Sequence, residues 1–113
     1  MDNVSGIFHI PNDIFHSYTI PGIELYLFEG IEPGGYLTSL ISGNLYMAAC
    51  RADHLNKPRL ADQAKWVLLN FPDESFGTPE NFKKWLNDKN KIRSTWAETM
   101  RTQHMWKILQ GVA

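Results

Sequence analysis

The chain has 113 residues, of which 43% are hydrophobic and 20% are charged, and its formal net charge is −1. This length suits one domain, and the composition excludes a disordered chain and a collagen-like repeat. No apolar run approaches the roughly 20 residues that a membrane-spanning helix needs, and the first residues lack the features of a signal peptide. Since a single cysteine suits a reducing compartment, we predict a cytoplasmic domain that spans no membrane.

The first twenty residues combine two tendencies. Residues 7–10 and 14–15 are β-prone, whereas residues 11–13 (Pro-Asn-Asp) are typical of a turn. We expect this segment to be extended or irregular, with a single turn. A first helix is then predicted over residues 22–29, with Pro21 near its start, Gly30 at its end and an inward face made of Ile23, Leu27 and Phe28.

Two short helices are predicted next. The first starts at the turn of residues 33–35 (Pro-Gly-Gly) and ends near Gly43, a position that commonly requires positive φ. Its inward residues are Tyr36, Leu37, Leu40 and Ile41. Asn44 is a candidate N-cap for the second helix. The predicted buried stripe of that helix is Leu45, Ala48, Ala49 and Ala52.

The clearest helical periodicity lies between Asn56, a candidate cap, and Pro72, which stops the helix. Pro58 occupies a first helical turn, where proline is tolerated. The predicted stripe is Leu60, Ala64, Val67, Leu68 and Phe71. After a loop over residues 72–77, Thr78 and Pro79 begin a helix that is expected to bury Phe82, Trp85 and Leu86.

The last helix is predicted over residues 95–110. Thr95 and Glu98 have capping-box spacing, Trp96 and Met100 share a face, and Gly111 closes the helix after a polar linker over residues 87–94. The sequence thus predicts an all-α, compact single domain of five or six short helices with an irregular N-terminal segment. Residues 1–88 form the helical domain, and residues 89–113 form a basic linker and a C-terminal helix that packs on the same domain or on a second subunit.

A set of small motifs is spread over two thirds of the chain: Ile10-Pro11, the helix from Ile23 to Glu29, Pro33-Gly34-Gly35-Tyr36-Leu37, Asn44-Leu45, Ala52-Asp53, Asn56, Gly77-Thr78 and Trp85-Leu86. With this pattern, residues 11–88 resemble a type of small protein encoded by phages and prophages. The chain departs from the pattern at Leu45, where an acid would follow the asparagine. The resemblance implies an origin in a phage or mobile element rather than an activity.

Charge is distributed unevenly along the chain. Residues 1–80 hold ten acids and four bases, which gives −6, whereas residues 81–113 hold seven bases and two acids, which gives +5. The two ends either neutralise each other or mark a partner of opposite sign. The alternative nucleic-acid face would be Lys83, Lys84, Lys89, Lys91, Arg93, Arg101 and Lys107.

No catalytic or metal-binding motif is present in the sequence. Cys50 and His54 are four residues apart, a spacing at which histidine could activate a thiol, but the apolar run before Cys50 favours a buried structural cysteine. The four histidines are scattered, and the glycine pair of residues 34–35 lacks the rest of a phosphate loop. We therefore expect no enzyme activity, no cofactor and no metal.

A polar cluster lies where one predicted helix ends and the next begins. It consists of Arg51, Asp53, His54, Asn56, Lys57 and Arg59, which either cap and solvate the helix ends or bind a partner. We expect a small non-enzymatic interaction protein whose partner is a bacterial host or phage protein, with inhibition of a defence or host enzyme as the most concrete version. A homodimer and a nucleic-acid-binding accessory protein are the alternatives.

Overall fold

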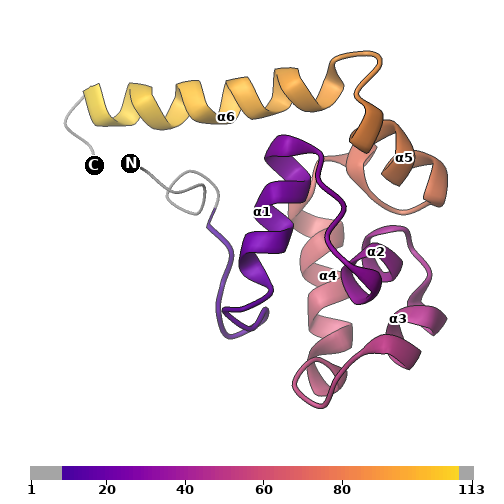
Figure 1. The fold of residues 1–113 in the computed structure, drawn as a ribbon. Helices are drawn as coiled ribbons and strands as arrows, with labels where there is room; N and C mark the ends of the chain where they lie inside the picture. Colours follow the sequence, from indigo (N-terminus) through magenta and orange to yellow (C-terminus); the bar gives the residue numbers. More distant parts are fainter. Residues whose placement is uncertain (1–8, 110–113) are drawn as a thin grey trace.

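Six α-helices build the fold in a computed structural model that describes residues 9–109, with side chains described as far as residue 103 (Figure 1). Residues 9–109 contain no strand, so the all-α prediction is confirmed. Two 3-10 turns, Lys57–Arg59 and Asp73–Ser75, precede α4 and α5. The α-helices are α1 (Ile20–Glu29), α2 (Gly35–Ile41), α3 (Leu45–Arg51), α4 (Leu60–Asn70), α5 (Pro79–Asn87) and α6 (Ile92–Leu109).

Helix α1 lies at the centre of the hydrophobic core. The Tyr26 side chain is fully buried on it, and burial raises the pKa of this tyrosine. Its hydroxyl donates to the carbonyl of Ser75 at 2.6 Å, and its ring stacks on Phe82 with 5.0 Å between centroids. The indole N–H of Trp85 donates to the Tyr26 carbonyl at 3.2 Å. One residue of α1 therefore fixes the positions of the 3-10 turn before α5 and of α5 itself.

Four of the local signals that were predicted to end or start helices are confirmed: Gly30, Gly43, Asn44 and Thr78. Gly30 and Gly43 have φ values of 68° and 83°. Asn44 and Thr78 cap α3 and α5, because each side-chain oxygen accepts a hydrogen bond from the backbone N–H three residues on, at 3.1 and 3.0 Å. The N-terminal segment, from residue 9 to α1, forms turns without regular secondary structure, as expected.

The predicted stripe of α4 is wrong at one position. Leu68 is 63% exposed, whereas Gln63 is fully buried. Positions 63 and 67 lie on the side of the helix that faces the core, and position 68 is turned too far toward solvent. Asn56 does not cap this helix either, because its side chain is hydrogen-bonded elsewhere and Pro58 lies in the 3-10 turn.

The predicted stripe of α3 is half right. Ala48 and Ala52 are buried, whereas Leu45 is 48% exposed and Ala49 is also exposed. Helix α3 is only seven residues long and contacts chiefly α2, so its opposite face has no cover within the described part of the chain. The apolar residues on that face are open to solvent.

Helix α6 begins three residues earlier than predicted. The Asp88 carboxylate accepts hydrogen bonds from the backbone N–H groups of Arg93 and Ser94, at 3.0 and 3.4 Å, and from the Ser94 hydroxyl. Burial alone would raise the pKa of Asp88, but the bonds from Ser94, together with the charge and the backbone N–H of Arg93, outweigh it and lower the pKa. The predicted capping box at residues 95–98 is therefore wrong, and Gly111 lies outside the described residues.

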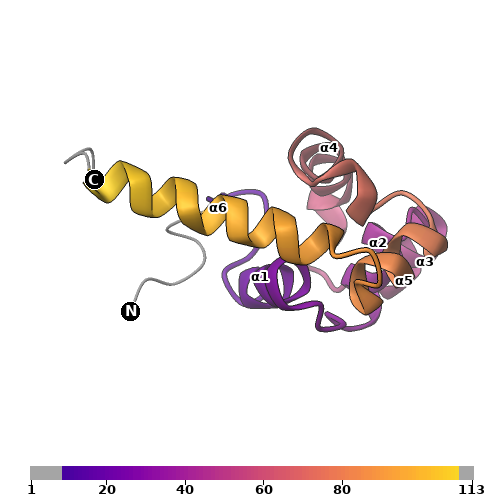
Figure 2. The same ribbon diagram turned by 90° about the horizontal axis from the view of Figure 1, so that it is seen from above.

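The first half of α6 packs on α1 and α5 of its own chain. The Trp96 ring lies 4.8 Å from Phe28 and 5.7 Å from Trp85, centroid to centroid, and Ala97 is buried beside them. Seen from above, α6 crosses the body between α1 and α4, and its far end extends beyond the other helices (Figure 2). Packing on the same domain is thus the alternative that the described contacts support.

Candidate functional site: a polar hollow between three helices

A hollow of about 260 Å³ lies where α1, the start of α2 and the end of α3 meet; we call it the polar hollow. Its walls are Tyr18 and Thr19 before α1, Gly22, residues 33–37, and three residues of the predicted polar cluster. Those three are Arg51, Asp53 and Asn56. Three of the segments that carry the phage-protein resemblance, residues 33–37, 52–53 and 56, therefore meet at one place in the fold.

The structure divides the predicted polar cluster into two groups. Arg51, Asp53 and Asn56 line the polar hollow, whereas His54 and Lys57 are exposed outside it and Arg59 is half-buried outside it. The reason is local: α3 ends at Arg51, and the next residue is extended with ψ of 132°, which turns the chain sharply. The cluster lies within residues 51–59 of the sequence, but only half of it lines the hollow.

The Asp53 carboxylate is held firmly in this turn. One of its oxygens, Oδ1, accepts the backbone N–H groups of Leu55 at 3.1 Å and Asn56 at 2.9 Å, as well as the Asn56 side-chain amide at 3.1 Å. The other oxygen, Oδ2, accepts the hydroxyl of Tyr18. Three bonds to one oxygen fix the carboxylate, and Oδ2 faces the hydroxyl that lines the hollow.

A chain of hydrogen bonds runs from the core to Asp53. The Tyr36 hydroxyl donates to the Gln63 side-chain oxygen, and the Gln63 amide donates to the Asn56 side-chain oxygen at 3.0 Å. The Asn56 amide in turn donates to the Tyr18 hydroxyl at 3.1 Å as well as to Asp53. The Gln63 amide also donates to the carbonyl of Ile14 at 3.0 Å, which holds Gln63 in place. The bonds that Asn56 and Tyr18 donate end at the carboxylate, so the network stabilises its negative charge.

The pKa values of the network follow from this arrangement. The hydrogen bond from Tyr18 is the main cause that lowers the pKa of Asp53, helped by the backbone N–H of Asn56. The same bond raises the pKa of Tyr18. Burial raises the pKa of Tyr36 to about 12. At neutral pH the hollow therefore contains one carboxylate and two neutral phenols.

Tyr18→Phe is expected to raise the pKa of Asp53 toward that of an ordinary aspartate. In the native protein this pKa is lowered, so the unfolded state takes up the proton first as pH falls. The stability that Asp53 contributes is present above about pH 4 and is lost as pH falls through the lowered native pKa. A carboxyl-carbon NMR titration of both proteins measures the shift, with Tyr46→Phe as the control. Equal Asp53 pKa values in all three would contradict the role of Tyr18.

The cation in the polar hollow is Arg51. One terminal nitrogen, Nη1, donates to the hydroxyl of Ser39 at 3.0 Å and to the carbonyl of Gly35 at 3.4 Å. Arg51 and Asp53 form no ion pair with each other in the described structure. The hollow therefore presents separate positive and negative groups.

Three residues of this site were missed in the sequence analysis: Tyr18, Tyr36 and Gln63. Gln63 carried a usable signal, because a glutamine three residues after Leu60 and four before Val67 occupies a position of the buried stripe. A buried polar side chain needs hydrogen-bond partners, so its position predicts a polar network nearby. Tyr36 was predicted to face inward, but nothing local in the sequence marks either tyrosine as a member of a polar network.

The prediction for Cys50 is wrong, because this cysteine is exposed. It lies on the open face of α3, away from the core. His54 follows the end of that helix and is exposed as well, so the two residues do not share a helical face. Their spacing of four therefore gives no thiol–histidine pair of the kind that was considered from the sequence.

The predicted nucleic-acid face is also divided. Arg93, with a side chain that is 15% exposed, donates to the carbonyls of Trp85 at 2.9 Å and Phe28 at 3.3 Å. Arg101 pairs with Glu29 at 2.8 Å and lies over the ring of Phe28. Both arginines are therefore engaged inside the chain. Lys83, Lys84, Lys89 and Lys91 are exposed, and the side chain of Lys107 lies outside the described residues.

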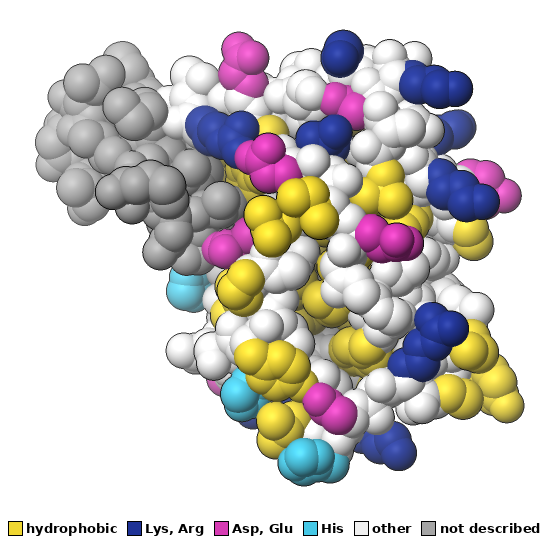
Figure 3. Space-filling model, in the orientation of Figure 1, with side chains coloured by type: hydrophobic (Ala, Val, Ile, Leu, Met, Phe, Trp, Pro, Cys, Tyr) yellow, Lys and Arg dark blue, Asp and Glu magenta, His cyan; other side chains and the backbone are white. Residues whose placement is uncertain are grey.

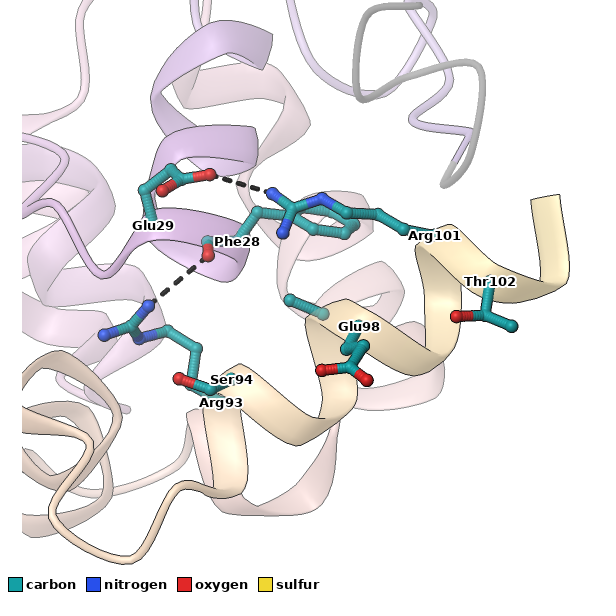
Figure 4. A pocket seen from close by; sticks show the side chains of 8 residues that line it. Phe28, Glu29, Arg93, Ser94, Glu98, Arg101 and Thr102 are labelled. Carbon is teal, nitrogen blue, oxygen red and sulfur yellow. Dashed lines mark hydrogen bonds and ion pairs between the residues drawn. The ribbon is translucent and has the colours of Figure 1, made fainter. Parts of the chain in front are cut away.

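The two arginines line a groove of about 530 Å³ between α1 and α6 (Figure 4). Glu29 and Glu98 line the same groove, and Figure 4 shows Glu29 reaching across to Arg101 while Arg93 reaches the end of α1. Acidic side chains beside each base disfavour the binding of phosphate groups. The groove does not have the composition of a nucleic-acid site.

Comparison of the chain with known protein families, curated proteins and solved structures finds no match. Within the part of the chain that the structure describes, no three His, Cys, Asp or Glu residues come together as metal ligands. None of the described helices is long and apolar enough to cross a membrane.

Proposed function

We propose that this chain is a small non-enzymatic protein that acts by binding a partner protein in the cytoplasm of a bacterial cell. The resemblance of residues 11–88 to proteins encoded by phages supports an origin in a phage or mobile element. A stoichiometric inhibitor of a defence or host enzyme is the most concrete form of this proposal, because binding alone is sufficient for such a role.

The observation that carries the proposal is the open side of α3, which we call the α3 face: Leu45, Tyr46, Ala49 and Cys50. These positions follow the spacing i, i+1, i+4 and i+5, which places them on one side of a helix. All four are exposed, and Tyr46 is 79% exposed. Figure 3 shows hydrophobic side chains protruding at the lower right, in the region of α3. Adjacent exposed apolar residues of this kind mark interaction sites.

Tyrosine is among the residues that contribute most to binding energy at protein interfaces, because its ring is large, rigid and amphipathic. The charges around the α3 face indicate the kind of partner. Residues 45–59 hold three bases and one acid, and Arg51 and Lys57 are exposed. The partner is therefore expected to present an apolar pocket with acidic residues at its rim.

Tyr46→Lys is expected to abolish capture of the partner from a bacterial lysate while leaving the melting temperature unchanged. The substitution adds a charge to the α3 face at a site that makes no buried contact. Leu69→Lys is the matched control, because Leu69 is 69% exposed on α4, a different helix. Capture that survives Tyr46→Lys but fails in the control would move the binding surface to α4. Light scattering of both variants separates partner binding from self-association.

A nucleic-acid-binding accessory protein is the second candidate, and the four exposed lysines of residues 83–91 favour it. Figure 3 shows basic side chains gathered at the upper right, in the region of α5. Replacing these lysines by glutamine in the same capture experiment tests this candidate. It predicts that captured material is sensitive to nuclease, is lost in the glutamine variant, and binds with an affinity that falls steeply with salt.

A further inference from the structure

The polar hollow holds one cation and one anion that do not neutralise each other. From this we infer that it binds a small zwitterion, a free α-amino acid, with its carboxylate on Arg51 and its ammonium group on Asp53. The hollow contains none of the four residues of the α3 face, although Arg51 lies beside both, and it needs no partner protein. The inference therefore goes beyond the proposed function and stands or fails independently of it.

The Arg51 side supplies hydrogen-bond donors for a carboxylate. A guanidinium has five N–H donors, and in this chain Nη1 donates to Ser39 and Gly35, while Nε and Nη2 donate to no described residue. These two nitrogens form the fork that binds a carboxylate through two parallel bonds. The bonds to Ser39 and Gly35 hold the guanidinium against the hollow before a ligand arrives.

The Asp53 side supplies an acceptor for an ammonium group. Three donors occupy Oδ1, whereas Oδ2 accepts only the Tyr18 hydroxyl among the described residues. A carboxylate oxygen has two lone pairs, so Oδ2 retains acceptor capacity, and Asp53 is one of the residues that line the hollow. The network from Tyr36 through Gln63 and Asn56 holds this carboxylate in its orientation.

The two charges together disfavour ligands that carry a single charge. A lone anion that approaches Arg51 is repelled by Asp53, and a lone cation that approaches Asp53 is repelled by Arg51. A ligand with both charges gains from both groups. The volume of about 260 Å³ is slightly below the range of pockets for drug-sized molecules and suits a ligand the size of an amino acid. Tyr18, Tyr36 and Leu37 give the hollow partly apolar walls.

The test is an NMR titration of the full chain with single free amino acids, followed on the backbone amides that line the hollow. At least one amino acid is expected to give saturable shifts there, whereas acetate, methylammonium and acetamide bind at least about tenfold more weakly, because each lacks one or both charges. Equal binding of any of these three compounds would overturn the inference. So would the absence of saturable shifts with all amino acids.

Variants assign the two charges. Arg51→Gln and Asp53→Asn are each expected to weaken the affinity for the bound amino acid by about tenfold or more. Arg101→Gln, which removes an exposed arginine outside the hollow, is the matched control and is expected to leave the affinity unchanged. Because Asp53→Asn alters a turn, the NMR spectrum of this variant is first checked for folding. Arg51→Gln leaves the hydrogen-bond network of Asp53 intact, so its affinity is sufficient to test the site. Unchanged affinity in a folded Arg51→Gln protein would contradict the site.

Discussion

A chain that ends at Asp88 is expected to lose its stable fold. The deletion of residues 89–113 removes Trp96, Ala97 and Met100 from the core and opens Phe28 and Trp85 to water. Burial of a large apolar side chain contributes about 1.5–3 kcal/mol, so this loss alone amounts to several kcal/mol. The deletion also leaves the carbonyls of Phe28 and Trp85 without the guanidinium that binds them. The total free energy of unfolding of a small domain is about 5–15 kcal/mol, so a loss of several kcal/mol is a large part of it.

Thermal melting and light scattering of the full-length and truncated chains measure this effect. We expect a large fall in melting temperature, or conversion of a dimer into a poorly soluble monomer. A chain that ends at Gln103 is the control, since it retains the described side-chain contacts of α6 with α1 and α5. If the chain that ends at Asp88 stays folded, monomeric and equally stable, α6 is not part of the domain core and becomes available to a partner.

Gly43→Val is expected to lower the free energy of unfolding by at least about 3 kcal/mol. Gly43 has φ of 83°, a conformation that costs a residue with a side chain about 1–2 kcal/mol. A Cβ at this position would also lie 2.2 Å from the carbonyl oxygen of Gly77. That oxygen belongs to backbone that cannot move freely, because the Gly77 N–H donates to the carbonyl of Ile41 at 2.9 Å.

Urea unfolding of the variant measures the loss, with Gly22→Ala as the control. Gly22 lies inside α1, and a Cβ there would be 3.5 Å from Leu37, an ordinary contact. Alanine is the better helix former, so the control is expected to be neutral or to stabilise the protein by up to about 1 kcal/mol. An unchanged unfolding free energy in Gly43→Val would mean that the turn between α2 and α3 is not constrained as described.

The features that could be predicted from the sequence are those that neighbouring residues determine. Gly30, Gly43, Asn44 and Thr78 act within one helical turn, and their roles are confirmed. The start of α6 was predicted wrongly because its cap, Asp88, acts on backbone N–H groups five and six residues further along the chain. Residues 95–98 match the sequence pattern of a capping box. The helix nevertheless starts earlier, where the Asp88 carboxylate accepts the backbone N–H groups of Arg93 and Ser94.

The candidate site shows the same division. Arg51, Asp53 and Asn56 could be found because they lie at a helix end, where polar side chains gather. Tyr18 and Tyr36 could not be found, because their hydrogen-bond partners are far away in the sequence. Tyr18 is 35 residues from Asp53, and Tyr36 is 27 residues from Gln63. The exposed state of Cys50 was missed because a helical stripe predicts which residues share a face, whereas the neighbouring helices decide whether that face is covered.

The contact between Arg93 and the ends of two helices has a consequence for the motions of the protein. The guanidinium fills the space beside Gly30, where a Cβ would lie 2.6 Å from its central carbon, and it binds carbonyls at the ends of both α1 and α5. Helix α6 cannot detach without exposing acceptor groups on two other helices. The α1 and α5 ends and the first turns of α6 therefore form one cooperative unit of local unfolding, although they are separate in the sequence.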